Sequence, residues 1–266
     1  MSQEWNNLFE VCNRMTQGIL HDEKIMQKYL VIQSRMDLYS VRNALVIAGQ
    51  YPQATRLVDV SKVKKTQEKE TPAIQIFNKK SSDSKQLIKY MYDVSQIEED
   101  VPMFSKEYNS INELIIELKE NSGIAIKLGN TDGYNVMFDE EEQTIFVKPL
   151  LPVEIILVDS SKAIIDYYIK DTGVDEKDSE CLSNLAHFMF LNRYEYLFDK
   201  TYQKILRTNK IPEIPQHWKQ LENESIIKLL NISKDMYSKM LDLSEKELRG
   251  KQKFNFTNDK KRDRER

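Results

Sequence analysis

The scarcity of glycine and proline is the feature that most restricts how this chain can fold. Each occurs only 7 times in 266 residues. Glycine supplies the left-handed backbone of tight turns and phosphate-binding loops, so this scarcity disfavours a nucleotide cradle and a sandwich with many tight turns. Apolar residues make up 40% of the chain and charged residues 30%, which is typical of a globular protein with a core. The length fits two small domains.

Apolar spacing predicts an α+β fold. Helical periods in the first fifty residues predict three helices, and Pro52 ends the third because a residue before proline leaves the α region. Beyond them we expect a small sheet with strands at 56–60, 73–77 and 89–94, followed by a linker at 96–106. After the linker we expect a helix at 110–120, strands at 124–127, 134–138 and 144–147, and mostly helices after Pro152. This pattern predicts domains at 1–96 and 107–249, followed by a basic disordered tail at 250–266.

Charge is distributed unevenly along the chain. The net charge of −3 combines +4 over residues 1–95, −12 over 96–248 and +5 over 249–266. A polyanion would therefore bind the front or the tail, and a basic protein partner would bind the acidic body. The alternative is that the asymmetry is accidental solvated surface.

Cysteine content and hydropathy predict the compartment. Cys12 and Cys181 are too few for a disulfide framework or a four-thiolate zinc site. The N-terminal residues lack the pattern of a secretory signal, and no apolar run approaches the roughly 20 residues of a membrane helix. We expect a cytoplasmic protein with no membrane partner.

Catalytic chemistry has little support in the residues. The three histidines, His21, His187 and His217, are far apart, so neither a triad nor a multi-histidine metal site has a local motif. Glu180 lies two helical turns before His187, and such a pair supplies at most two ligands. The carboxylate runs at 98–100 and 139–142 are interpreted as solvated turns.

The third helix and its exit carry a denser polar and aromatic pattern. Aromatic rings, arginines and amides are interleaved there, a combination that suits single-stranded nucleic acid because bases stack on rings while arginine binds phosphate. The candidate binding residues are Tyr39, Arg42, Asn43, Gln50 and Arg56, with Lys62, Lys64 and Lys65 as phosphate contacts. The alternative is that Asn43 and Gln50, which project from one side of the helix, hold it to the neighbouring sheet through buried hydrogen bonds.

Two motifs resemble a known family. The segment at 39–55 reads YSVRNALVIAGQYPQAT, and the segment at 92–96 reads YDVSQ. The first resembles the signature of ArdC-like antirestriction proteins, which include the LtrC-type proteins of mobile elements in Gram-positive bacteria, and the second resembles the motif that ends their N-terminal domain. The resemblance implies an N-terminal domain that binds single-stranded DNA and a C-terminal domain with a zinc metallopeptidase fold.

The chain departs from that family where zinc would bind. An HExxH helix is expected near 159–163, but these positions hold Asp, Ser, Ser, Lys and Ala. Two histidines four apart are needed to bind zinc from one helix face, so Asp159 and Ala163 cannot replace them. Glu180 matches the family's downstream acidic ligand but has no metal to hold. Between Thr55 and Phe77 the chain also lacks the family's tryptophan and glycine.

These observations lead to one expectation and one alternative. We expect a non-catalytic accessory protein of a plasmid or integrative element in a bacterial cytoplasm, which binds single-stranded DNA, needs no cofactor or metal and carries a degenerate peptidase-like domain. Its role would be conjugative transfer, establishment or antirestriction. The alternative is a protein-interaction scaffold in which both ancestral activities are lost. An active zinc peptidase would need ligands that this chain lacks.

Overall fold

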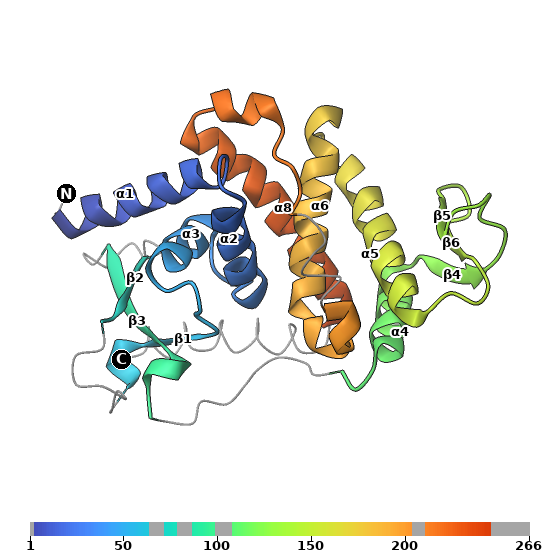
Figure 1. Ribbon diagram of the computed structural model, residues 1–266, viewed down its shortest axis with the longest axis horizontal. Helices are drawn as coiled ribbons and strands as arrows, with labels where there is room; N and C mark the ends of the chain where they lie inside the picture. Colours follow the sequence, from blue (N-terminus) through green and yellow to red (C-terminus); the bar gives the residue numbers. More distant parts are fainter. Residues whose placement is uncertain (1–2, 64–71, 79–86, 99–107, 204–210, 246–266) are drawn as a thin grey trace, which may run out of the picture. The chain divides into compact units, whose positions relative to one another are not determined.

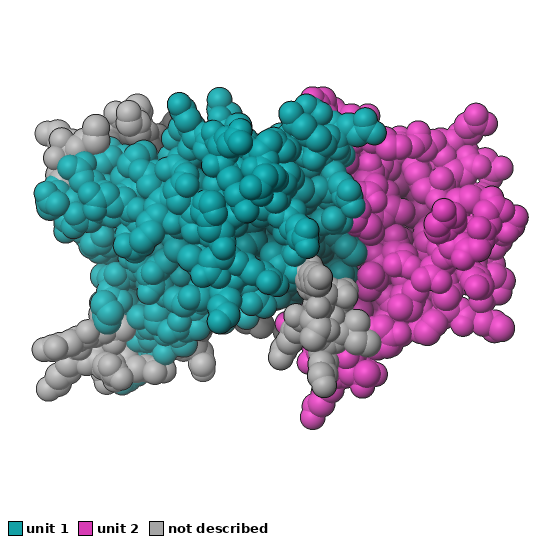
Figure 2. Space-filling view, turned by 45° about the horizontal axis from the view of Figure 1, so that its top comes forward, with its two compact units in different colours: residues 1–102, 175–193, 210–235 teal, residues 103–174, 194–209, 236–266 magenta. Residues whose placement is uncertain are grey.

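The protein is an α+β chain, as the sequence predicts. The computed structural model describes residues 3–63, 72–78, 87–98, 108–203 and 211–245. The chain divides into two compact units (Figure 2). The first unit comprises Met1–Pro102, Asp175–Arg193 and Lys210–Asp235, and the second comprises Met103–Val174, Tyr194–Asn209 and Met236–Arg266. Lys64, Lys65, the tail at 250–266 and most of the expected linker lie outside the described residues.

Three helices form at the start of the chain, which confirms the prediction from apolar spacing. They are α1 (Gln3–Gly18), α2 (Glu23–Arg35) and α3 (Val41–Gln50). Asp22 caps α2 by accepting a hydrogen bond from the Lys24 backbone N–H, and Ser40 caps α3 by accepting one from the Asn43 N–H. α3 ends as expected, because Tyr51 lies before Pro52 and adopts a non-helical φ of −145° and ψ of 77°.

A three-stranded antiparallel sheet follows, within one or two residues of the predicted strands. Its strands are β1 (Leu57–Asp59), β2 (Ile74–Phe77) and β3 (Ile88–Asp93), in the order β1-β3-β2. The 3₁₀ helices η1 (Val60–Lys62) and η2 (Val94–Gln96) follow β1 and β3. Ile74, Ile76 and Met91 share one face and are buried, so this face belongs to the core. Figure 1 shows the sheet beside α1 and α3.

Later segments of the chain complete the first unit, which differs from the continuous domain expected at 1–96. These segments contain α6 (Glu176–Arg193), η4 (Gln216–Gln220) and α8 (Asn223–Ser244) as far as Asp235. α6 packs against α2, and the Asn192 amide donates a hydrogen bond of 2.6 Å to the Ser34 hydroxyl. The physical reason is that α2 buries Tyr29, Leu30 and Ile32 completely, so α2 needs a further apolar neighbour.

The second unit has its own small sheet and helices, where the sequence predicts them. They are α4 (Ile111–Ser122), β4 (Ala125–Leu128), β5 (Val136–Asp139), β6 (Thr144–Val147), α5 (Val153–Lys170) and η3 (Glu195–Leu197). The strand order is β4-β6-β5, with β4 parallel and β5 antiparallel to β6. Phe138 of β5 packs edge-on against Tyr167 of α5 at 5.1 Å between ring centroids, which joins this sheet to its helix. No helix in the described ranges is both long and apolar enough to cross a membrane.

Candidate nucleic-acid interface

Asn43 and Gln50 bind the backbone of strand β2, which is the structural alternative that the sequence left open. The Asn43 amide donates to the Phe77 carbonyl (3.0 Å) and accepts from the Phe77 N–H (2.8 Å). The Gln50 amide donates to the Gln75 carbonyl (2.8 Å) and accepts from the Gln75 N–H (3.0 Å). Both amides therefore use their donor and their acceptor inside the protein, and base edges would have to displace these bonds.

The spacing of the two amides matches the geometry of a strand edge. In an antiparallel pair, alternate residues turn their backbone groups away from the partner strand, so Gln75 and Phe77 present theirs at the outer edge of β2. Two strand residues span about 7 Å, whereas seven helix residues span about 10.5 Å. The longer side chain of Gln50 bridges the difference. α3 thus covers the edge of β2, which would otherwise be open to pairing with another strand.

Arg42 is held by an acidic partner that sequence reasoning did not identify. Its Nη2 atom lies 2.6 and 2.5 Å from the two carboxylate oxygens of Glu224, at the start of α8. The side chains are 32% and 55% exposed, so the pair is accessible to solvent and a phosphate would compete with the carboxylate. Of the predicted lysine contacts, Lys62 is exposed at the end of η1.

Tyr39 differs from an open stacking platform because its hydroxyl end is buried. The side chain is half-buried in the turn between α2 and α3, and its backbone carbonyl accepts a hydrogen bond of 3.3 Å from the Gln33 amide. Burial, followed by the negative charge of Asp59, raises the pKa of the Tyr39 hydroxyl to about 12. A ring in this environment packs against the protein on part of its surface, which favours a structural contribution.

The YDVSQ motif forms a buried capping site. One carboxylate oxygen of Asp93, which is fully buried, accepts from the backbone N–H groups of Thr55 (2.7 Å) and Arg56 (2.8 Å). The other accepts from the Ser95 N–H (3.0 Å) and hydroxyl (2.6 Å), while the Gln96 side chain accepts from the Asp93 N–H (2.8 Å). These bonds join the chain that leaves α3 to the end of β3. Both motifs of the resemblance therefore stabilise the same unit.

The face of the three-stranded sheet opposite Met91 presents two half-buried tyrosines, beside the buried Ile88 of the same face, that sequence reasoning missed as a site. Tyr90 and Tyr92 are two apart on the central strand β3, so they point to the face opposite buried Met91. Gln75 lies opposite Tyr90 and Val58 lies opposite Tyr92 in the strand register. All four are half-buried. The signal for this face was the pair of tyrosines two residues apart in KYMYD.

Arg56 is the predicted arginine that belongs to this aromatic face. The Val94 N–H donates to the Arg56 carbonyl at 2.9 Å, which extends the ladder of β1 and β3 by one residue. Arg56 is two residues before Val58 and therefore lies on the same face as Val58 and Tyr92. Burial lowers the pKa of the guanidinium, which stays positive at neutral pH. We call Tyr90, Tyr92, Gln75, Val58 and Arg56 the sheet-face cluster.

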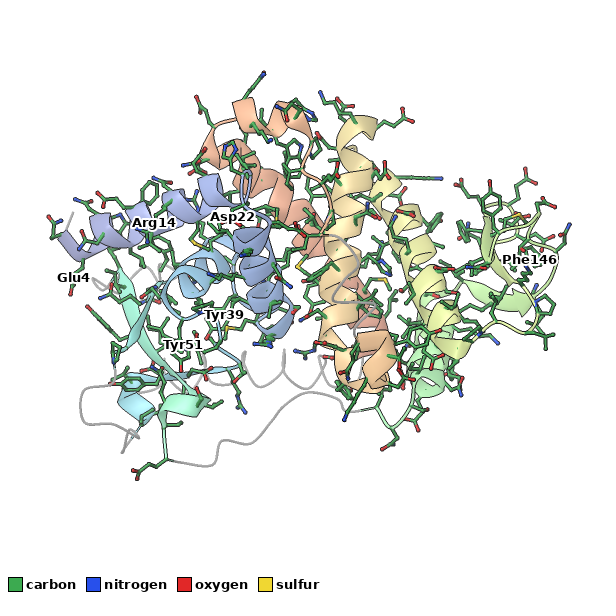
Figure 3. All side chains as sticks on the ribbon, viewed as in Figure 1. Glu4, Arg14, Asp22, Tyr39, Tyr51 and Phe146 are labelled. Atoms are coloured by element: carbon green, nitrogen blue, oxygen red, sulfur yellow. The ribbon has the colours of Figure 1, made fainter. Side chains whose placement is uncertain are left out.

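The first turn of α1 borders the sheet-face cluster. The Tyr90 hydroxyl donates to the Glu4 carboxylate at 2.9 Å, and the Trp5 ring meets Phe77 edge-on with 5.1 Å between centroids. This hydrogen bond, followed by burial and the negative charge of Glu4, raises the pKa of the Tyr90 hydroxyl. Figure 3 shows Glu4 at the end of α1 that lies near the sheet.

The segment that falls where the family has its zinc helix forms α5 without a metal-binding arrangement. Asp159 accepts a hydrogen bond of 3.1 Å from the Asn135 amide, and Lys162 pairs with Asp166 at 2.6 Å. Glu180 is exposed. Over the residues that the structure describes, no three His, Cys, Asp or Glu side chains are grouped so that they could hold a metal ion.

The third histidine has a structural partner. His217 lies 2.7 Å from the Asp178 carboxylate, and the same oxygen accepts from the Trp218 indole N–H at 2.6 Å. Trp218 is fully buried, so Asp178 fixes η4 on α6 within the first unit. His187 is half-buried on α6.

Comparison of the chain with protein-family models, with curated proteins and with solved structures found no match. The resemblance to the ArdC-like family therefore depends on the two motifs in the sequence.

Proposed function

We propose that the first unit binds single-stranded DNA on its sheet-face cluster, as part of a non-catalytic accessory protein of a bacterial plasmid or integrative element. The observation that carries this proposal is the pair Tyr90 and Tyr92, half-exposed on one face of β3, with Arg56 directly before the neighbouring strand β1. The resemblance at 39–55 and 92–96 supports the choice of ligand and of genetic context.

Chemistry favours a single strand over a duplex at this surface. Alternate side chains on a strand are about 7 Å apart, so the two tyrosine rings offer successive faces on which unpaired bases can stack. In a duplex these base faces are covered by neighbouring base pairs. Arg56 supplies a positive charge for the backbone, and residues 1–95 carry a net charge of +4. Gln75 adds an amide beside the rings.

The decisive measurement is fluorescence anisotropy with a labelled mixed-sequence strand of about 20 nucleotides, compared with the matching duplex, at about 50 and about 200 mM salt. We expect the single strand to bind more tightly, with affinity that falls as salt rises. Tyr90→Ala and Tyr92→Ala should each weaken binding by about 5- to 150-fold, the equivalent of losing a stacking interaction of about 1 to 3 kcal/mol.

A matched control comes from the second unit. Tyr134 is 70% exposed there, so Tyr134→Ala removes an accessible tyrosine that belongs to the other unit. It should leave affinity unchanged. Arg56→Gln should flatten the salt dependence by about 0.7 in the logarithmic slope. If Tyr90→Ala and Tyr92→Ala bind like Tyr134→Ala while circular dichroism shows folded protein, the sheet face is not the binding surface.

The scaffold alternative has one observation in its favour. Leu128, Tyr134 and Leu150 of the second unit are 71%, 70% and 102% exposed, and the sequence from 96 to 248 has a net charge of −12. Exposed apolar side chains in an acidic segment suit a basic protein partner. This alternative predicts no DNA binding at low salt, so the anisotropy experiment distinguishes the two functions.

A further inference from the structure

A carboxylate beside the sheet-face cluster already accepts the hydroxyl proton of one of its two tyrosines. The Glu4 carboxylate accepts the hydroxyl proton of Tyr90 at 2.9 Å. A tyrosine hydroxyl has one proton to donate, so it can serve either Glu4 or a phosphate oxygen, but not both with full strength. Hydrogen bonds to ionised acceptors are stronger than those to neutral acceptors, so the Glu4 carboxylate is an effective acceptor for the Tyr90 hydroxyl.

We propose that Glu4 competes with the nucleic-acid phosphate for Tyr90, so that the first turn of α1 limits the affinity of the sheet face for a single strand. This inference depends on the proposed function and adds its regulation. When a base stacks on Tyr90, the adjoining phosphate approaches the carboxylate, and like charges repel. The strand binds after the Glu4 side chain has turned away from the hydroxyl.

Packing contacts of neighbouring residues hold the turn of α1 that carries Glu4. Trp5 packs edge-on against Phe77, and Leu8, one turn further along α1, is buried. These contacts hold the first turn over the end of the sheet. A carboxylate in the first turn also complements the helix dipole. The backbone of α1 can therefore stay in place while the Glu4 side chain alone changes its rotamer.

Charge removal at Glu4 gives a direct test with a matched control. Glu10 is also exposed on α1 and has the same charge, so Glu10→Gln changes the net charge equally at a position about 1.7 helical turns from Glu4. We expect Glu4→Gln to bind the labelled single strand about fivefold more tightly at low salt, the effect of one unit-charge repulsion at contact distance in water. The gain should shrink at about 200 mM salt.

A double-variant cycle tests the role of the hydroxyl itself. Tyr90→Phe keeps the ring for stacking and removes the proton for which Glu4 and phosphate compete. In this background, Glu4→Gln should improve affinity by less than it does in the wild-type protein. Tryptophan emission checks the fold, because Trp5 and the buried Trp218 are the two tryptophans of the chain.

The possible outcomes separate this inference from the proposed function. Equal affinities for Glu4→Gln and Glu10→Gln, with a wild-type protein that binds the strand, would overturn the competition and leave the DNA-binding surface intact. An undiminished gain from Glu4→Gln in the Tyr90→Phe background would also overturn it. Failure of the wild type and of Glu4→Gln to bind at low salt would overturn both proposals.

Discussion

Replacing Asn43 by alanine tests whether the family-like motif acts in folding or in binding. Asn43 is 8% exposed and makes two hydrogen bonds with the backbone of Phe77. Alanine leaves the Phe77 N–H and carbonyl without these partners, and each unsatisfied group costs about 1 to 3 kcal/mol. The higher helix propensity of alanine returns about 0.5 kcal/mol. We expect Asn43→Ala to lower the free energy of unfolding by about 1.5 to 5.5 kcal/mol.

Gln50→Ala provides an internal comparison. Gln50 makes the equivalent pair of bonds with Gln75 but is exposed, so water can replace the lost partners. We expect a loss of about 0.5 to 1 kcal/mol. Gln53→Ala, at an exposed residue in the turn after α3, should change the free energy of unfolding by less than about 0.5 kcal/mol.

The assay combines urea unfolding with hydrogen–deuterium exchange. Loss of the Asn43 bonds should raise exchange in the peptide that contains residues 74–77, because Phe77 no longer has a partner for its outward N–H. The affinity for single-stranded DNA should not change in the folded variant. The reasoning is wrong if Asn43→Ala is as stable as Gln53→Ala and loses DNA binding, since the amide would then contact the ligand.

Substitutions at three other contacts complete the tests. Asp93→Asn replaces a carboxylate oxygen by an amino group that faces N–H donors, and should lower the free energy of unfolding in urea by about 3 kcal/mol. A double-mutant cycle with Arg42→Ala and Glu224→Ala should give a coupling energy in unfolding of up to about 1 kcal/mol, and DNA affinity should not change. A large loss of DNA affinity in Arg42→Ala alone would show that Arg42 binds phosphate. Burial alone would raise the pKa of Asp59, but the hydrogen bonds from Lys89 and Ser61 outweigh it and lower the pKa from 3.8 to about 2. Since the folded pKa is depressed, this stabilisation is complete above pH 4 and is lost as the pH falls through 2. Asp59→Asn should therefore be about 1 to 2 kcal/mol less stable than wild type in urea unfolding at pH 7. The two proteins should be equally stable when urea unfolding is repeated below pH 2.

Local elements were predictable because their causes lie within a few residues. The helical period of apolar residues and the cap at Ser40 define α3, and Pro52 ends it. Strand β3 was expected at 89–94 and forms at Ile88–Asp93, because β-branched and aromatic residues favour an extended backbone. The placement of Asn43 and Gln50 on one side of a helix also followed from the 3.6-residue period alone.

The partners of those residues depended on the tertiary structure. Sequence periodicity left open whether Asn43 and Gln50 face bases or a strand, and the answer came from β2 lying beside α3. The same holds for Arg42, whose partner Glu224 is separated from it by 182 residues. No local pattern contains such a contact.

The sequence by itself therefore determined the secondary structure, the fold class and the side of each element on which a residue lies, since these depend on backbone preferences and on short-range periodicity. Only the tertiary structure decided which sides are covered. It buried the face with Met91, left Tyr90 and Tyr92 half-exposed beside Arg56, and placed the Glu4 carboxylate against Tyr90. Burial and pairing follow from the packing of segments that are distant in sequence, and this packing moved the candidate interface from helix α3 to the face of the sheet.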